Sequence, residues 1–124
     1  MRQRLGRRSL VADSVYCAAA GTALIGLRST AAVRAGLAPR TIGIVGAFVV
    51  LWAGFVAALS RRRLGRSLAV VGTANVVAAL ALVATAVQQR RPQDRRILAV
   101  TGLEVAAFAA SQALALGLSE RRAA

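Results

Sequence analysis

The sequence predicts an all-α fold, a polytopic membrane protein whose four transmembrane helices form an antiparallel bundle in a single domain, residues 1–124. Two observations predict it. Hydrophobic residues make up 57% of the chain and charged residues 17%, with a mean hydropathy of +0.61, a balance unlike that of soluble domains. The apolar residues also gather in four long runs, each separated from the next by arginines. These runs are residues 10–27, 41–59, 68–87 and 97–118.

The length of these runs indicates membrane-spanning helices. At a rise of 1.5 Å per residue, roughly 20 helical residues cross a hydrocarbon core of about 30 Å, and each run approaches that length. Runs rich in Ala, Leu and Val lack the alternation of barrel strands, and an open strand leaves backbone groups without partners in lipid. A soluble four-helix bundle would need a polar stripe on each helix, and residues 41–59 have none.

The first run could also be read as a secretory signal peptide. Four arginines precede it, Arg7 and Arg8 faintly resemble a twin-arginine start, and the alanines at 18–20 could end in a cleavage site. However, Asp13 interrupts the apolar segment and three further spans follow. We therefore expect an uncleaved first helix.

The connections between the runs predict how the helices are joined. Residues 28–40 contain Ala31, Ala32 and Val33, which could form a short interfacial helical turn, and Pro39 should end that turn and begin the next helix. Residues 60–67 and 88–96 are short and rich in arginine. Links this short require antiparallel neighbours.

The arginines predict the orientation. Ten of the 17 lie at the termini or in residues 60–67, and seven lie in the two connections on the other side. By the positive-inside rule both termini are cytoplasmic, in the inner (plasma) membrane of a cell. Such a near balance is also typical of dual-topology dimers, which stay an alternative. The net charge of +13 favours attraction to anionic lipid headgroups over nucleic-acid binding, since no aromatic residues are interleaved with the arginines.

The composition excludes most familiar catalytic machinery. Histidine is absent and Cys17 is the only cysteine, so there is no imidazole base, no disulfide within the chain and no CxxC pair. The sequence predicts neither an enzyme nor a cofactor or metal. Cys17 is interpreted as a small packing residue.

Polar residues inside the spans are the candidate functional residues, since an ionisable group near a helix centre costs about 3 kcal/mol and faces protein or water. They are Asp13, Asn75, Glu104 and Gln112. Asp13, about one turn into its run, is expected to form a boundary ion pair with Arg8 or Arg66. Glu104 is the deepest charge, and it either meets an arginine from residues 28–40 or exchanges a proton.

Helical spacing places five residues of the last run on one face that should point into the bundle. They are Glu104, Phe108, Ser111, Gln112 and Ala115. Gln112 and Asn75 lie at comparable depths, so a hydrogen bond between them is expected to hold helices together.

Small residues predict where helices approach closely. Gly21 follows Asp13 and Cys17 on a stripe of the first run. In the second run, Gly43 and Ala47 have the small-xxx-small spacing and Gly54 extends the set.

Together these features resemble a group of small, mostly uncharacterised four-helix integral membrane proteins of bacteria. The resemblance rests on Asp13, Gly21, Asn75, Ser111 and Gln112, and it implies a membrane location more than an activity. Small multidrug transporters differ, since they carry a glutamate among aromatic neighbours in the first helix. Fluoride channels differ as well, since their second helix carries an asparagine that residues 41–59 lack.

Two functions are compatible with these residues. The first is a non-enzymatic membrane protein that acts by association, as a homo-oligomer or as an accessory subunit of a larger membrane complex. The alternative is a small proton- or cation-linked transporter or channel that uses Glu104, helped by Thr22, Asn75 and Gln112.

Overall fold

The computed structural model describes residues 2–120, with the side chains of residues 3–117, and this part of the chain is helical without strands. Its five helices are α1 (Arg2–Gly26), α2 (Arg28–Ala35), α3 (Pro39–Leu59), α4 (Leu64–Gln88) and α5 (Pro92–Glu120). Four of them, all except α2, are long and apolar enough to cross a membrane. The expected all-helical fold with four candidate spans is confirmed.

The long helices extend beyond the predicted apolar runs. The first candidate span begins at Gln3 instead of residue 10, and the last begins at Pro92 instead of residue 97. Hydropathy detects only the apolar middle of a helix. Arginine is a good helix former and proline fits the first helical turn, so the backbone stays helical through the charged ends.

The connection between α1 and α3 contains the expected short helix. Helix α2 has eight residues and ends at Gly36, whose φ of 67° is the left-handed conformation that glycine adopts at helix C-termini. Pro39 then occupies the start of α3. Both features agree with the sequence.

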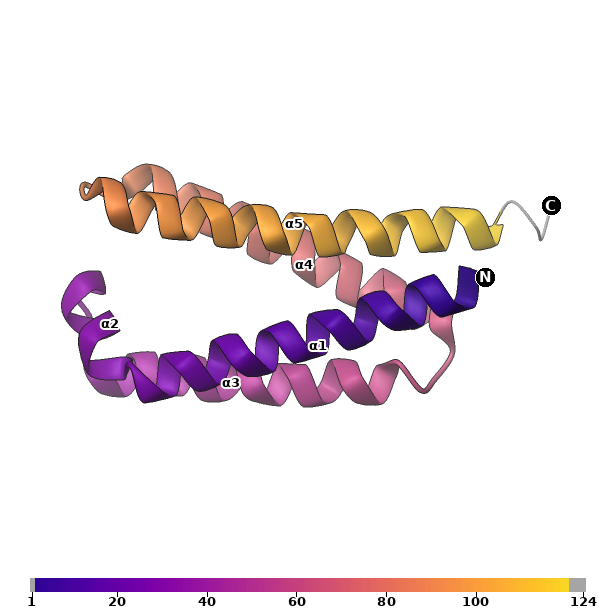
Figure 1. The fold of residues 1–124 in the computed structure, drawn as a ribbon, viewed down its shortest axis with the longest axis horizontal. Coiled ribbons are helices and arrows are strands. Elements are labelled where there is room, and N and C mark those ends of the chain that lie inside the picture. Colours follow the sequence, from indigo (N-terminus) through magenta and orange to yellow (C-terminus); the bar gives the residue numbers. More distant parts are fainter. Residues whose placement is uncertain (1, 121–124) are drawn as a thin grey trace.

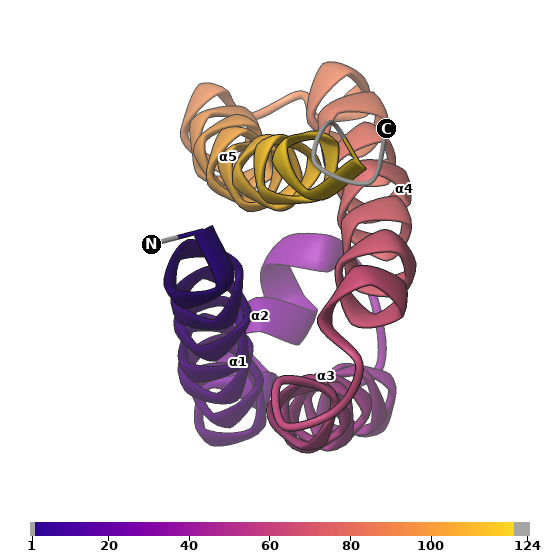
Figure 2. The same ribbon diagram turned by 90° about the vertical axis from the view of Figure 1, so that its right-hand side faces the viewer.

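The long helices form two closely packed pairs, α1 with α3 and α4 with α5 (Figures 1 and 2). We call the end where α1 begins and α5 ends the terminal end, and the opposite end, which carries α2, the α2 end. The two pairs approach each other at the terminal end and move apart toward the α2 end (Figure 1).

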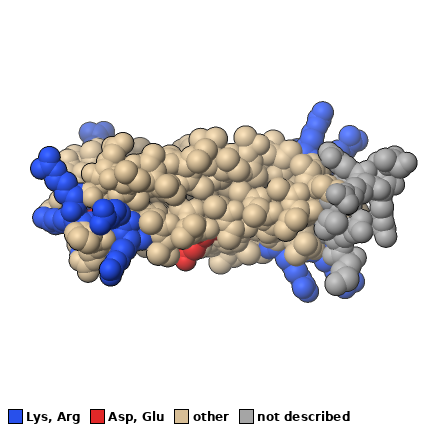
Figure 3. All heavy atoms as spheres, turned by 90° about the horizontal axis from the view of Figure 1, so that it is seen from above, with Lys and Arg blue, Asp and Glu red and all other residues tan. Residues whose placement is uncertain are grey.

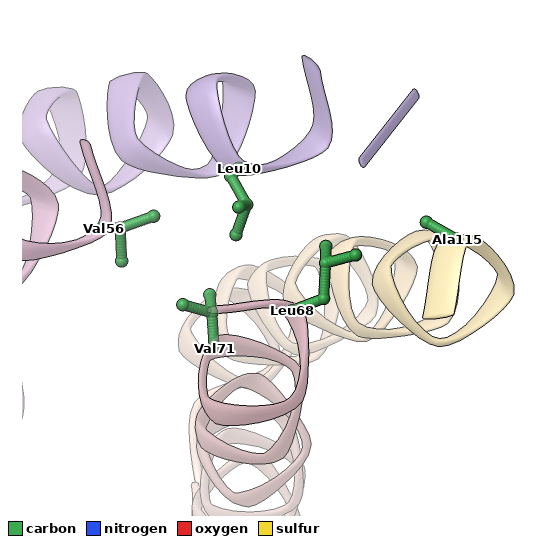
Figure 4. Packing of buried hydrophobic residues seen from close by; sticks show 5 residues of the cluster. All are labelled: Leu10, Val56, Leu68, Val71 and Ala115. Atoms are coloured by element: carbon green, nitrogen blue, oxygen red, sulfur yellow. The ribbon is translucent and has the colours of Figure 1, made fainter. Parts of the chain in front are cut away.

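The buried apolar core lies at the terminal end, where all four long helices contribute to it. Figure 4 shows its central residues: Leu10, Val56, Leu68, Val71 and Ala115. Each of them is at most 4% exposed. Burial therefore fastens the two pairs together at this end.

Helices α1 and α3 cross at two buried glycines. A Cβ atom added to Gly21 would lie 2.7 Å from the carbonyl oxygen of Gly46, and one added to Gly46 would lie 2.8 Å from that of Gly21. Gly21 of the stripe on the first run forms this crossing, but the small residues named on the second run do not meet it. Ala47 is exposed and Gly54 has nothing within 4 Å, because the rotation of α3 turns Gly46 toward α1.

The surface between the two ends is apolar. Several large hydrophobic side chains on the outside are more than half exposed, among them Phe48, Leu51, Leu80 and Leu103. Figure 3 shows the basic side chains gathered at the two ends, with a largely uncharged surface between them. Exposed apolar area on this scale needs a non-aqueous partner.

Candidate functional site: two polar clusters on helix α1

A buried carboxylate lies between three helices. Asp13 on α1, Asn75 on α4 and Gln112 on α5 are 1%, 4% and 0% exposed. Asn75 Nδ2 donates to Asp13 Oδ2 at 2.6 Å, and Gln112 Nε2 donates to the same oxygen at 2.9 Å. With Cys17, whose Sγ donates to Asp13 Oδ1 at 3.6 Å, these residues form what we call the Asp13 cluster.

Local helix geometry positions the cluster. Asp13 and Cys17 are four residues apart on α1 and therefore share a face. Gln112 packs across Gly72 of α4, where an added Cβ would lie 3.6 Å from Gln112 Oε1. An added methyl group would make ordinary van der Waals contact with the amide, so α4 and α5 pack closely here without requiring glycine.

Three of the four hydrogen bonds in the cluster are donated to the carboxylate. Its oxygens accept from two amides and a thiol, and Gln112 Oε1 accepts from Asn75 Nδ2 at 3.2 Å, which completes a triangle. This arrangement suits an ionised carboxylate, which only accepts. In the described part of the chain every buried side-chain nitrogen and oxygen has a partner. The cluster therefore joins the two helix pairs through hydrogen bonds among α1, α4 and α5.

This geometry corrects the expected boundary ion pair of Asp13. The ion pair recorded among the described residues joins Arg34 and Asp94 at 3.6 Å, and neither Arg8 nor Arg66 pairs with Asp13. Because α1 begins at Arg2, Asp13 lies about three turns inside the helix instead of one. Amide donors, and not arginine, compensate its charge.

The predicted hydrogen bond between Asn75 and Gln112 is confirmed, but the central role of Asp13 was missed. A signal was present in the sequence. Asp13, Cys17 and Gly21 were recognised as one stripe of α1, but that stripe was not predicted to face the bundle. An acid on such a face needs donors, and the two amides supply them.

Glu104 lies apart from this cluster. Its carboxylate is exposed, and Oε2 accepts a hydrogen bond of 2.5 Å from the hydroxyl of Tyr16 on α1. The Tyr16 ring packs against Phe108, with ring centroids 5.6 Å apart. We call Tyr16, Glu104 and Phe108 the Tyr16–Glu104 cluster.

The expected interior face of α5 is only partly interior. Gln112 and Ala115 are buried, Ser111 and Phe108 are half-buried, and Glu104 is exposed. Exposure rises toward the α2 end because the two helix pairs separate in that direction (Figure 1). An arginine partner for Glu104 is not found among the described residues, where Arg34 of the expected connection contacts Asp94 instead.

Two serines of α1, Ser9 and Ser14, add polar contacts to its neighbours. The hydroxyls of Ser9 and Ser111 lie 2.6 Å apart and join α1 to α5. Ser14 donates to the carbonyl oxygen of Ala53 on α3 at 2.8 Å. Together with the Asp13 cluster, these contacts give α1 a side-chain hydrogen bond to each of the other long helices.

The described residues contain no group of three or more His, Cys, Asp or Glu side chains that could hold a metal ion. The Asp13 cluster can hold a charge in a buried interior, and the Tyr16–Glu104 cluster presents a carboxylate on the outside.

No protein-family model matches the chain, and no curated protein or solved structure matches it significantly.

Proposed function

We propose that the protein is a multi-pass integral protein of the plasma membrane that acts without catalysis, by association with other membrane-embedded chains. The four long helices cross the bilayer as an antiparallel bundle with both termini in the cytoplasm. Their length, the apolar surface between the two arginine-rich ends and the ten-to-seven distribution of arginines support this arrangement.

The observation that carries the proposal is the exposure of Glu104. This residue lies eight positions beyond Arg96, about 12 Å along the helix axis from the arginines. A charged carboxylate at such a depth costs about 2.5–3.5 kcal/mol in lipid. One tyrosine hydroxyl does not satisfy its two oxygens, so we infer that another membrane chain covers this side of α1 and α5.

The state of the interior supports the same conclusion. In the Asp13 cluster, the carboxylate oxygens, Asn75 Nδ2 and both polar atoms of the Gln112 amide already form hydrogen bonds within the chain. This leaves the cluster little to offer a transported solute. Polar contacts between membrane helices of this kind serve as glue. The Tyr16–Glu104 cluster is what remains available for contact with a partner, which is either a second copy or a larger membrane complex.

The test is the association state in bilayers, measured by single-molecule photobleaching of labelled protein in liposomes and by purification from native membranes in mild detergent. We expect the wild type to form an assembly of two or more chains in both measurements and the Glu104→Leu variant to be a monomer. Leu103→Ala is the matched control, since Leu103 is 67% exposed on the adjacent position of α5, and it should assemble normally. A wild type that is monomeric in both measurements would contradict the proposal.

One observation favours the transporter alternative. Glu104 is accessible and has no arginine partner among the described residues, as a proton-exchanging carboxylate must be. Proton flux into liposomes loaded with a pH-sensitive dye distinguishes the two functions. A flux that Glu104→Gln abolishes, in protein that remains monomeric, would replace association by transport.

A further inference from the structure

A cavity of about 610 Å³ lies at the α2 end, between α2 and the ends of α4 and α5. Its size falls within the range of roughly 300–1,000 Å³ typical of small-molecule sites. It forms where the two helix pairs have moved apart (Figure 1). The residues that line it include Leu27, Arg34, Leu37, Thr85, Asp94, Ile97 and Leu98.

The walls of this cavity are largely apolar and incompletely packed. Leu27 is 62% exposed, Ile97 53% and Leu37 52%, and all three line the cavity. Each would gain about 25 cal/mol for every Å² covered by an apolar ligand. The walls therefore favour a hydrocarbon occupant over water.

The edge of the cavity is basic. Arg34 is 47% exposed and makes a single long contact, 3.6 Å from its Nη1 to Asp94 Oδ1, so most of its five N–H donors stay available. The connections at this end contain seven arginines and one acid, Asp94. An arginine in such a field binds phosphate through paired hydrogen bonds.

We propose that this cavity binds one anionic phospholipid, with an acyl chain against Leu27, Leu37 and Ile97 and the phosphate on Arg34. The site rests on the membrane insertion proposed above and is separate from the Tyr16–Glu104 cluster. Its depth agrees with a lipid, because Leu98 lies six residues beyond Pro92, about 9 Å below the start of α5.

Volume and charge select a lipid over a protein segment. A helix about 10 Å in diameter would fill 610 Å³ within about 8 Å of its length, roughly five residues. A second copy of this chain would also bring another arginine-rich end against the first. A flexible acyl chain fits the volume, and its anionic headgroup complements the charge.

The experiment uses the full-length protein in mild detergent, incubated with equal amounts of phosphatidylglycerol and phosphatidylcholine and examined by native mass spectrometry. We expect one phosphatidylglycerol per chain, retained about tenfold over phosphatidylcholine. Both lipids carry the phosphate, but the choline cation of phosphatidylcholine is repelled by the arginines at this end. Thr85→Trp fills the cavity from α4, where the Thr85 hydroxyl bonds only within its own helix, and should remove the bound lipid. Val87→Trp is the control, since Val87 is 75% exposed and outside the lining.

Two charge variants separate specific binding from general attraction. Arg34→Gln should abolish the preference for phosphatidylglycerol, whereas Arg40→Gln, outside the lining, should keep it. Asp94→Asn should increase the retained phosphatidylglycerol, because it frees Arg34 and removes a repelling carboxylate. Equal retention of the two lipids by the wild type, retention by Thr85→Trp, or equal losses in the two arginine variants would each overturn the proposal. A second protein chain in place of lipid would also overturn it.

Discussion

Replacement of Asn75 tests whether the hydrogen bonds of the Asp13 cluster stabilise a buried, ionised Asp13. Asn75 Nδ2 donates to Asp13 at 2.6 Å and to Gln112 at 3.2 Å, so Asn75→Leu removes two contacts and leaves Asp13 Oδ2 with Gln112 as its amide donor. A polar contact between membrane helices averages about 0.6 kcal/mol, whereas a hydrogen bond to a charged group is worth about 1.5–3 kcal/mol. We expect a loss of about 2–4 kcal/mol in the free energy of unfolding.

The measurement is reversible unfolding in mixed micelles of a mild detergent and sodium dodecyl sulfate, followed by circular dichroism. Asn75→Ala separates the lost donor from the larger volume of leucine and should show a loss of similar size. Val77→Leu is the matched control on the same helix, because Val77 is 61% exposed, and it should unfold like the wild type.

The decisive variant replaces the whole polar triangle. In Asp13→Leu/Asn75→Leu/Gln112→Leu no charge is left buried, and apolar replacement of a complete buried polar group is often neutral or stabilising. We therefore expect the triple variant to be more stable than Asn75→Leu alone. An Asn75→Leu variant as stable as the wild type would refute a stabilising role of this amide. A triple variant whose loss in unfolding free energy equals the sum of the three single-variant losses would refute the buried charge.

Three further predictions concern other parts of the fold. Gly21→Ala should destabilise the protein by about 1–3 kcal/mol, because the added Cβ meets the backbone of α3 at 2.7 Å, whereas Gly54→Ala, with nothing within 4 Å, should not; equal unfolding transitions would contradict the crossing. Glu104→Gln keeps an acceptor for Tyr16 and should change the unfolding free energy by less than about 1 kcal/mol, and a larger loss would indicate that the charge is structural. Reporter fusions should place the C-terminus in the cytoplasm, and transfer of two or three arginines from residues 60–67 to 88–96 should invert or randomise the orientation; a wild-type C-terminus outside the cell would refute the assignment.

The long helices were predictable because hydropathy and helix length act along the chain. Each of the four apolar runs lies mostly within one long helix, and Pro39 begins α3 as expected. Their exact ends were not predictable from hydropathy, because the helical backbone continues through arginines that reach away from the apolar surface. Such residues lower the hydropathy of a segment without ending its helix.

The candidate site was predictable in its members but not in its grouping. Helical spacing placed Gln112 and Glu104 on one face of α5, yet the first is buried and the second exposed. Helical spacing predicts which residues share a face, but that whole face is buried only if the neighbouring helices stay close along its length. Here the two helix pairs diverge toward the α2 end (Figure 1). The position of Asp13 depended likewise on the true start of α1 and on the direction of its face, and both are set by packing between helices.

The two ends of the bundle differ for one physical reason, namely where the chain places its buried polar groups. At the terminal end, the Asp13 cluster and the core around Leu10 and Val71 couple the helix pairs, and breaking that joint would expose a carboxylate to an apolar surrounding. At the α2 end, the residues that the structure describes form no polar joint of comparable burial between the helix pairs, and Arg34 and Asp94 form a long, partly exposed ion pair there. Separation of the pairs at that end therefore breaks no buried polar joint of this kind, which supports the lipid site proposed there.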